Sequence, residues 1–215
     1  AKYTLRADEM FLNRMIGGTF EGSNDPDFRE KEVLYLINEK PKRLQTVVQS
    51  YSSKSYRYVR YIGPKDSHCN IAEAAFYTPN DTASLKGKVI GTPGCFQKDG
   101  SHEYTNVFDG DVTTSFDYIE PSGGWSGLDL GTPKQIGRIV YTPRSYDNYI
   151  RSGDDYELFY CARRNNWKSL GDQRSKADSL IYIKIPVNAL LLLCNNTRGI
   201  QERIFVYTAA EQIWK

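Results

Sequence analysis

A short loop after the strand-like run IVYT at 139–142 carries four side chains suited to binding a hydroxyl-rich ligand. Arg144 offers a planar guanidinium with several donors, and Asn148 offers an amide that both donates and accepts. Tyr146 and Tyr149 could stack on the apolar face of a sugar ring. Loops at strand ends are where a β-sandwich displays its binding residues. The pattern therefore predicts a binding site at this loop.

The same loop also admits a structural interpretation. Arg144 would then form an ion pair with Asp147 or Asp154, and Asn148 would simply occupy a turn. The two tyrosines would pack on the rim of the fold. The sequence leaves both interpretations open.

A second group of oxygen-bearing side chains is centred on the segment FDGDVTTSF at 108–116. Its central glycine can adopt the positive φ of a tight turn, and Asp109 and Asp111 can accept backbone N–H bonds. One interpretation is a turn and nothing more. The other adds Thr114 and the distant Glu202, which gives a cluster of hard oxygens typical of a Ca²⁺ site. Such an ion would brace the turn structurally.

Composition argues against several function classes. The 215-residue chain has a formal net charge of +2 and no basic block, so no nucleic-acid partner is expected. Only His68 and His102 could supply imidazole, and the four cysteines form no C-x-x-C pair, so zinc is not expected. Neither a nucleophile–base couple nor a facing pair of carboxylates can be placed. We therefore predict that the chain is not an enzyme.

Two further features concern the cysteines and the membrane. Cys161 and Cys194 each end an apolar run, which indicates buried free thiols, with a disulfide as the alternative. The longest apolar stretch, 189–194, is too short to span a bilayer, so no membrane insertion is expected. The first residues, AKYTLRADE, contain no apolar core of a secretion signal.

The elements that must position these residues are strands. Short runs rich in Val, Ile, Leu, Tyr and Phe recur between clusters of Gly, Pro, Asn and Asp, as a β-sandwich requires. Sustained helical periodicity is missing. The sequence predicts an all-β fold with strands in the segments 33–37, 56–62, 139–142, 155–161, 180–185 and 190–194.

The chain also repeats itself. Residues 2–25 parallel residues 140–163, each with a Tyr-Thr-x-Arg end, a polar loop and an aromatic-Glu strand. Residues 56–78 parallel residues 188–208, and we expect each of these to be a β-hairpin. The second arms carry corresponding residues, Glu73 with Phe76 and Glu202 with Phe205.

Only the second copy has a front half before it, at residues 86–135. We therefore predict a partial, back-half module at 1–80 and a complete sandwich at 86–215, joined by the linker PNDTASLKG at 79–87. A half sandwich would expose its inner face and strand edges.

The ordered motifs resemble the discoidin, or coagulation factor 5/8 type C, family and its bacterial relatives, the family 32 carbohydrate-binding modules. The resemblance covers nearly the whole chain and rests on FEGSND at 20–25, RYVRY…NIAEAAFY at 57–77, FDGDVTTSF at 108–116, WSGLDLG at 125–131, YTPRSYDNYIRSGDDYELFY at 141–160, Trp167 and QERIFVY at 201–207.

The resemblance implies a galactose-binding-like jelly-roll sandwich that binds carbohydrate at its loop rim. It also implies a structural calcium beside the turn at 108–116 and a bacterial protein that is extracellular, on the cell surface or periplasmic. In the relatives, an Arg and an Asn that match Arg144 and Asn148 hold sugar hydroxyls. The alternative function is a protein-interaction or spacer module that positions a neighbouring domain of a larger protein.

One departure from the family concerns Phe116-Asp117, where galactose-binding relatives often have Trp-His. The Asp117 carboxylate can accept hydrogen bonds from sugar hydroxyls, so we count it among the ligand-binding residues. It cannot both donate and accept as a neutral imidazole does. The departure disfavours galactose as the particular ligand.

Overall fold

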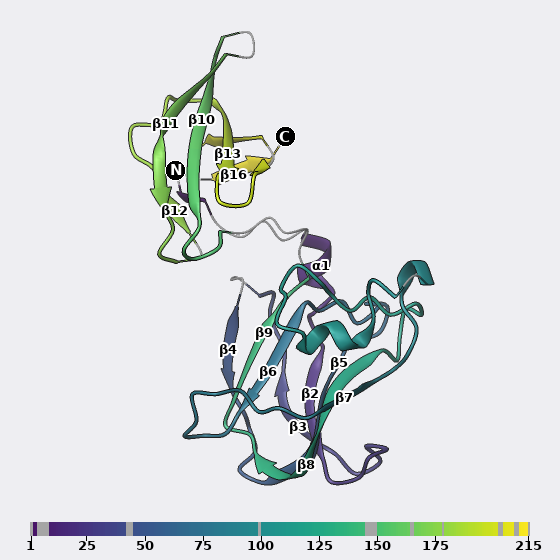
Figure 1. The fold of residues 1–215 in the computed structure, drawn as a ribbon. Coiled ribbons are helices and arrows are strands. Elements are labelled where there is room, and N and C mark those ends of the chain that lie inside the picture. Colours follow the sequence, from purple (N-terminus) through teal and green to yellow (C-terminus); the bar gives the residue numbers. More distant parts are fainter. Residues whose placement is uncertain are drawn as a thin grey trace. The chain divides into compact units, whose positions relative to one another are not determined.

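The structure, a computed structural model, confirms the predicted all-β class. Antiparallel strands make up nearly all of its regular structure, together with one short α-helix and two 3-10 helices among the described residues (Figure 1). The structure describes residues 2–3, 9–41, 45–98, 100–144, 150–163, 166–177, 179–201, 204–208 and 211–214.

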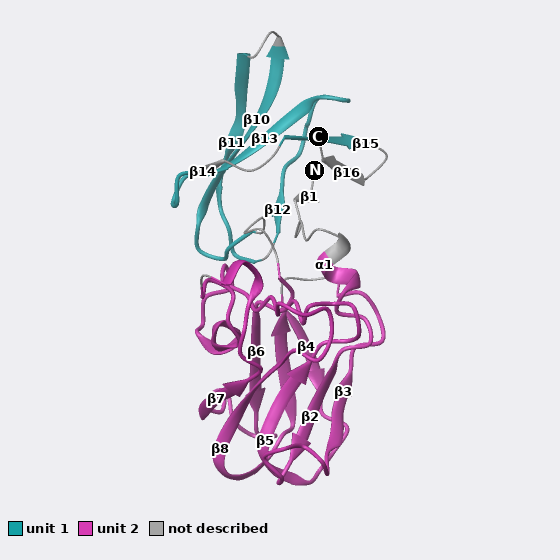
Figure 2. Ribbon diagram, turned by 90° about the vertical axis from the view of Figure 1, so that its right-hand side faces the viewer, with its two compact units in different colours: residues 1–6, 148–215 teal, residues 7–147 magenta. Residues whose placement is uncertain are grey.

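The chain forms two compact units, shown in different colours in Figure 2. Unit 2 is the segment Ala7–Asp147, and unit 1 combines Ala1–Arg6 with Asn148–Lys215. This division differs from the predicted one at residues 80–86. Strands on both sides of the supposed linker at 79–87 pair with one another, so they belong to the same unit.

The larger sheet of unit 2 is antiparallel and has five strands. β5 pairs along most of its length with β8, from Ser55 opposite Gln135 to Ile62 opposite Trp125. The front half at 86–135 therefore completes the first copy of the repeat, not the second. In spatial order the strands are β3 (Glu32–Leu36), β2 (Thr19–Ser23), β5 (Ser55–Ile62), β8 (Trp125–Gln135) and β7 (Lys88–Gly91).

A three-stranded antiparallel sheet forms the other layer of unit 2. Its order is β4 (Thr46–Gln49), β9 (Arg138–Thr142) and β6 (Glu73–Tyr77). β5 and β6 thus lie in different sheets, and the hairpin expected at 56–78 is wrong. β5 pairs with β8 and β6 pairs with β9, so β5 and β6 do not pair with each other.

Aromatic rings from both sheets form one core. The Phe20 ring on β2 lies 6.0 Å from that of Phe76 on β6 and 5.4 Å from that of Tyr141 on β9. All three side chains are buried. Successive side chains of a strand point to opposite faces of its sheet, so each sheet directs one set of side chains toward the other sheet. The two sheets therefore pack as layers of a sandwich.

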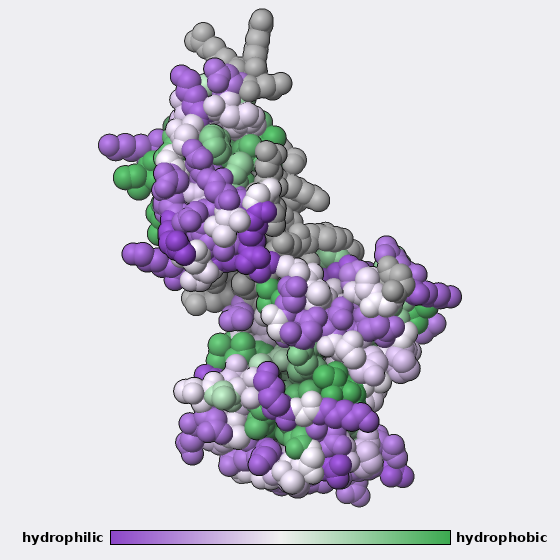
Figure 3. Space-filling view, in the orientation of Figure 1, coloured by the Kyte–Doolittle hydropathy of each residue, from purple (hydrophilic) through white to green (hydrophobic). Residues whose placement is uncertain are grey.

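Short helices decorate unit 2. The helix α1 (Glu9–Asn13) precedes β2, and the 3-10 helices η1 (Phe96–Lys98) and η2 (Tyr104–Phe108) lie between β7 and β8. On the face shown in Figure 3, apolar side chains gather in the middle of unit 2 and hydrophilic ones surround them. Among the described helices, none has the length and hydropathy needed to cross a bilayer.

Unit 1 is built around one sheet. Its order is β11 (Asn166–Arg174), β10 (Asp155–Arg163), β13 (Leu190–Asn195), β15 (Phe205–Thr208) and β16 (Glu211–Trp214), with β14 (Ile200–Gln201) also on β13 and a separate pair of β1 (Lys2–Tyr3) with β12 (Leu180–Ile181). Here the hairpin-like pairing expected at 188–208 is present, because β13 and β15 are antiparallel neighbours. The buried residues of unit 1 include Tyr156, Leu158, Leu191, Leu193 and Phe205.

All four cysteines are free. Cys69 and Cys95 are buried, and Cys161 and Cys194 are partly exposed. Burial raises the pKa of the Cys69 thiol to about 12, so it remains protonated near neutral pH.

Candidate functional site

A buried carboxylate organises the end of unit 2 that is nearest to α1. Asp117 follows Phe116, which bridges to Ile71 just before β6. The Asn70 amide donates to Asp117 Oδ1 at 2.6 Å, and the Arg144 guanidinium forms an ion pair with Asp117 Oδ2. The backbone N–H of Asp117 donates to the carbonyl of His102 at 3.1 Å. This residue is therefore held on several sides.

Arg144 is held just after the end of β9. Its guanidinium carbon lies 4.5 Å from the centre of the Phe11 ring, and only 11% of its side chain is exposed. Since a buried carboxylate and an aromatic face both contact it, the guanidinium is fixed in orientation. Such a fixed set of donors and acceptors can recognise a polar ligand without first becoming ordered.

The structure brings together two of the five predicted ligand-binding residues, Arg144 and Asp117. The other three, Asn148, Tyr146 and Tyr149, lie outside the described residues. Asp147, one of the two ion-pair partners considered for Arg144, also lies outside them.

Sequence reasoning missed Asn70, which touches Asp117. It lies in the motif NIAEAAFY, three residues before Glu73, and the only signal for it was membership of that motif.

Asp154, the other partner considered for Arg144, forms a similar cluster in unit 1. Its Oδ2 accepts from Asn195 Nδ2 at 2.9 Å and from Arg198 Nε at 2.7 Å. Burial alone would raise the pKa of Asp154, but these two hydrogen bonds, together with the charges of Arg198 and Arg151, outweigh it and hold that pKa below the ordinary value of 3.8. The Arg198 side chain is 46% exposed, so this guanidinium is much less enclosed than that of Arg144.

The turn at 108–116 forms a second polar centre of unit 2. Thr114 Oγ1 donates to Asp109 Oδ2 at 2.8 Å, and the Asp111 N–H donates to Asp109 Oδ1 at 2.7 Å. Gly110 adopts a φ of 84°, the left-handed conformation expected for it, and its N–H donates to Glu73 Oε1 at 2.9 Å. Asp109, Asp111 and Thr114 are therefore brought together.

The glutamate at this turn is Glu73, whereas Glu202 was expected. Glu73 corresponds to Glu202 in the repeat, and it reaches the turn because β6 belongs to unit 2. Glu202 itself lies outside the described residues. Burial, together with a hydrogen bond and repulsion from the Asp109 carboxylate, raises the pKa of Glu73 to about 8. Glu73 is therefore largely protonated near neutral pH.

The Glu73–Asp109 pair meets part of what a Ca²⁺ site requires. Glu73 and Asp109 present the hard oxygens that Ca²⁺ prefers, and an adjacent cavity of 270 Å³ leaves room beside them. The described residues contain no group of three or more His, Cys, Asp or Glu side chains placed to hold a metal. Backbone carbonyl oxygens and the Thr114 hydroxyl would have to supply the remaining ligands.

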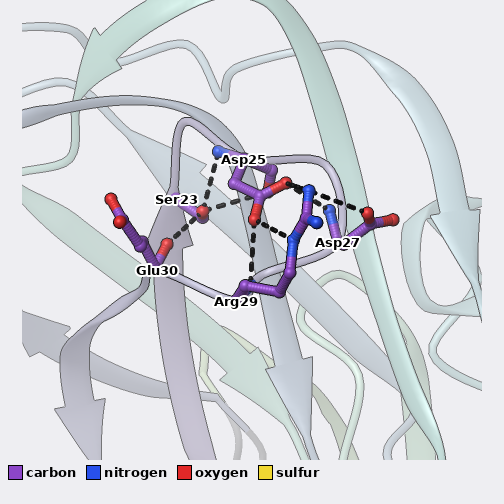
Figure 4. Close-up of polar contacts among 5 residues, drawn as sticks. All are labelled: Ser23, Asp25, Asp27, Arg29 and Glu30. Atoms are coloured by element: carbon purple, nitrogen blue, oxygen red, sulfur yellow. Dashed lines mark hydrogen bonds and ion pairs between the residues drawn. The ribbon is translucent and has the colours of Figure 1, made fainter.

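The opposite end of unit 2 carries a polar loop after β2, shown in Figure 4. Asp25 accepts from Arg29 Nε at 2.9 Å, and Ser23 Oγ donates to the carbonyls of Asp25 and Glu30. The hydrogen bond from Arg29 lowers the pKa of Asp25 to about 2. Every one of these groups is used within the loop, which is the pattern of a self-contained turn.

Comparison of the chain with protein-family models, with curated proteins and with solved structures finds no match.

Proposed function

We propose that this protein is a non-catalytic carbohydrate-binding module of the discoidin type, which binds sugar hydroxyls at the loop end of unit 2. The observation that supports it most directly is the rigid cluster in which Asp117 holds the Asn70 amide and the Arg144 guanidinium. Sugar recognition needs fixed donors. The Arg144 guanidinium would supply them, and the buried Asp117 and Asn70 side chains fix its position. The two-layer architecture of unit 2 agrees with the resemblance.

From the same resemblance we propose a bacterial protein that is extracellular, on the cell surface or periplasmic. A site at a sandwich rim covers little of a sugar, so affinity for a single unit is expected to be modest. Several modules acting together would supply useful binding.

A structural Ca²⁺ is part of the proposal. Glu73, Asp109 and Thr114 would hold it beside the turn at 108–116, and the ion would replace the proton that Glu73 carries near neutral pH. Its role would be to brace the turn.

A glycan array followed by calorimetric titration tests the function. Arg144→Ala should weaken binding at least tenfold, the loss of about 1.4 kcal/mol. Arg198→Ala, which removes the corresponding guanidinium from unit 1, should leave binding unchanged. Failure of the wild type across a broad glycan panel would refute the proposal.

A second function, docking of a neighbouring domain, is favoured by the exposed apolar side chains of unit 1. Ile181, Ile183 and Val187 are 64%, 77% and 89% exposed within a stretch of seven residues. Clustered exposed apolar residues are typical of interaction surfaces. Co-expression with adjacent coding regions and size-exclusion chromatography test this function, because Ile183→Asp should then abolish co-elution.

A further inference from the structure

A shallow groove opens beside the proposed sugar site of unit 2. It has a volume of 390 Å³ and lies between the end of α1 and the loop that follows β5. Its lining includes Asn13, Arg14, Pro64, Lys65, Asp66 and Ser67.

Arg14 connects this groove to the Arg144 cluster. Arg14 Nη1 donates to Asn70 Oδ1 at 2.8 Å, and Asn70 in turn donates to Asp117. Two hydrogen bonds therefore separate Arg14 from the carboxylate that holds Arg144. A ligand that contacts Arg144 could extend one of its substituents into the groove.

The charge of the groove is positive. Arg14 and Lys65 line it together with a single carboxylate, that of Asp66. Neither cation forms an ion pair with a carboxylate in the part of the chain that the structure describes. Arg144, by contrast, is neutralised by Asp117. The unbalanced positive charge thus lies in the groove and not at the Arg144 cluster.

The wall of the groove is rigid. Ser67 Oγ donates to the Pro64 carbonyl at 2.6 Å, and the Asp66 N–H donates to Ser122 Oγ at 3.1 Å. Asp66, His68 and Cys69 all have positive φ, a conformation that non-glycine residues adopt only where the surroundings hold them. The groove therefore needs little ordering before it binds a ligand.

We propose that this groove binds the carboxylate of an acidic sugar, so that the ligand of the module is a glycan containing uronate. The inference rests on the proposed function and names the class of its ligand. The guanidinium of Arg14 matches a planar carboxylate with paired donors, and Lys65 adds a flexible second charge.

Calorimetric titration of the full chain with glucuronate and galacturonate oligosaccharides and with the methyl esters of each tests this proposal, because each acid and its ester differ only in the charged group. The wild type should bind the acid about tenfold more tightly than the ester, the effect of one charge-assisted hydrogen bond. In Arg14→Gln the ratio should fall to about two. In Arg14→Lys, which keeps the charge, it should remain above that of Arg14→Gln.

Arg29→Gln is the matched control, because it removes an exposed guanidinium from the opposite end of unit 2 and should keep the wild-type ratio. Thermal unfolding of each variant shows that it is folded. Equal affinity of the wild type for acid and ester, with binding of neutral glycans retained, overturns the acidic-sugar inference alone. Failure to bind these ligands and every neutral glycan overturns the proposed function as well.

Discussion

Units 1 and 2 begin from the same sequence pattern and end as different structures. In unit 2 the strands β3, β2 and β5 lie side by side, and in unit 1 the corresponding β11, β10 and β13 do the same. Beyond this triplet they diverge. β5 is extended by β8, whereas β13 is extended by β15. A repeated sequence fixes which strands form, but the strands available elsewhere in the chain decide how the sheet is completed.

The two units also differ within the shared triplet, at a pair of corresponding glutamates. Glu21 on β2 is buried and bonds to Arg60 Nε at 2.8 Å, with the Arg60 guanidinium 4.0 Å from the Phe28 ring centre. Its counterpart on β10, Glu157, is half-buried and accepts a long 3.4 Å hydrogen bond from Asn196 Nδ2.

The largest expected effect follows from that contrast. Glu21→Ala should lower the free energy of unfolding by about 3–5 kcal/mol, because it leaves the buried Arg60 charge without the carboxylate that pairs with it. Glu157→Ala should cost about 0.5 kcal/mol or less. Urea unfolding of the two variants measures both values, and similar losses would contradict the contrast.

A second pair of positions sharpens the comparison of packing. A methyl group on Gly22 of β2 would lie 2.6 Å from the Tyr56 ring, whereas unit 1 has the buried Leu158 at the corresponding position. Gly22→Ala should therefore cost about 1–3 kcal/mol through overpacking. Denaturant midpoints provide the measurement.

A double-mutant cycle with Tyr56→Ala provides the control for Gly22→Ala, because alanine lacks the Cγ and Cδ atoms that the added methyl would meet. The cost of the added methyl should shrink when the ring is gone. If Gly22→Ala cost the same free energy of unfolding in both backgrounds, contact with the Tyr56 ring would not be its cause.

The two repeated glutamates predict different responses to pH and calcium. The pKa of Glu73 rises from 4.5 to about 8 on folding, so the stability that its proton contributes is complete below about pH 4.5 and is lost as the pH rises to about 8. The unfolding temperature should fall across this range, and Glu73→Gln should flatten the dependence. Calorimetry at a series of pH values measures it.

Millimolar Ca²⁺ should raise the unfolding temperature most at the alkaline end of that range, where Glu73 is ionised. Glu73→Gln should abolish this rise, whereas Glu202→Gln should preserve it. The reverse outcome would restore the original expectation that Glu202 is the ligand.

The sequence predicts β2, β5, β9, β10 and β13 because their signals are local: apolar alternation and turn residues define them without reference to partners. The strand expected at 180–185, by contrast, is present only as Leu180–Ile181. Partner choice depends on contacts between residues far apart in the chain. The segment 86–135 could pair with either copy of the back half, and no local pattern distinguishes the two.

The same ambiguity governs the candidate site. Arg144 and Asp117 could be selected from their chemistry, and the structure joins them. Asn70 and Glu73 could not be chosen, because they lie in the first copy and reach the site only when that copy is completed by residues 86–142.

The location of ligand binding tests the central claim most directly. Backbone amide chemical shifts should be followed by NMR while the tightest glycan from the array is titrated into the full chain. We predict perturbations concentrated around Asn70, Asp117 and Arg144 of unit 2, with those around Asp154 and Arg198 of unit 1 unchanged. Perturbations confined to unit 1 would contradict the account.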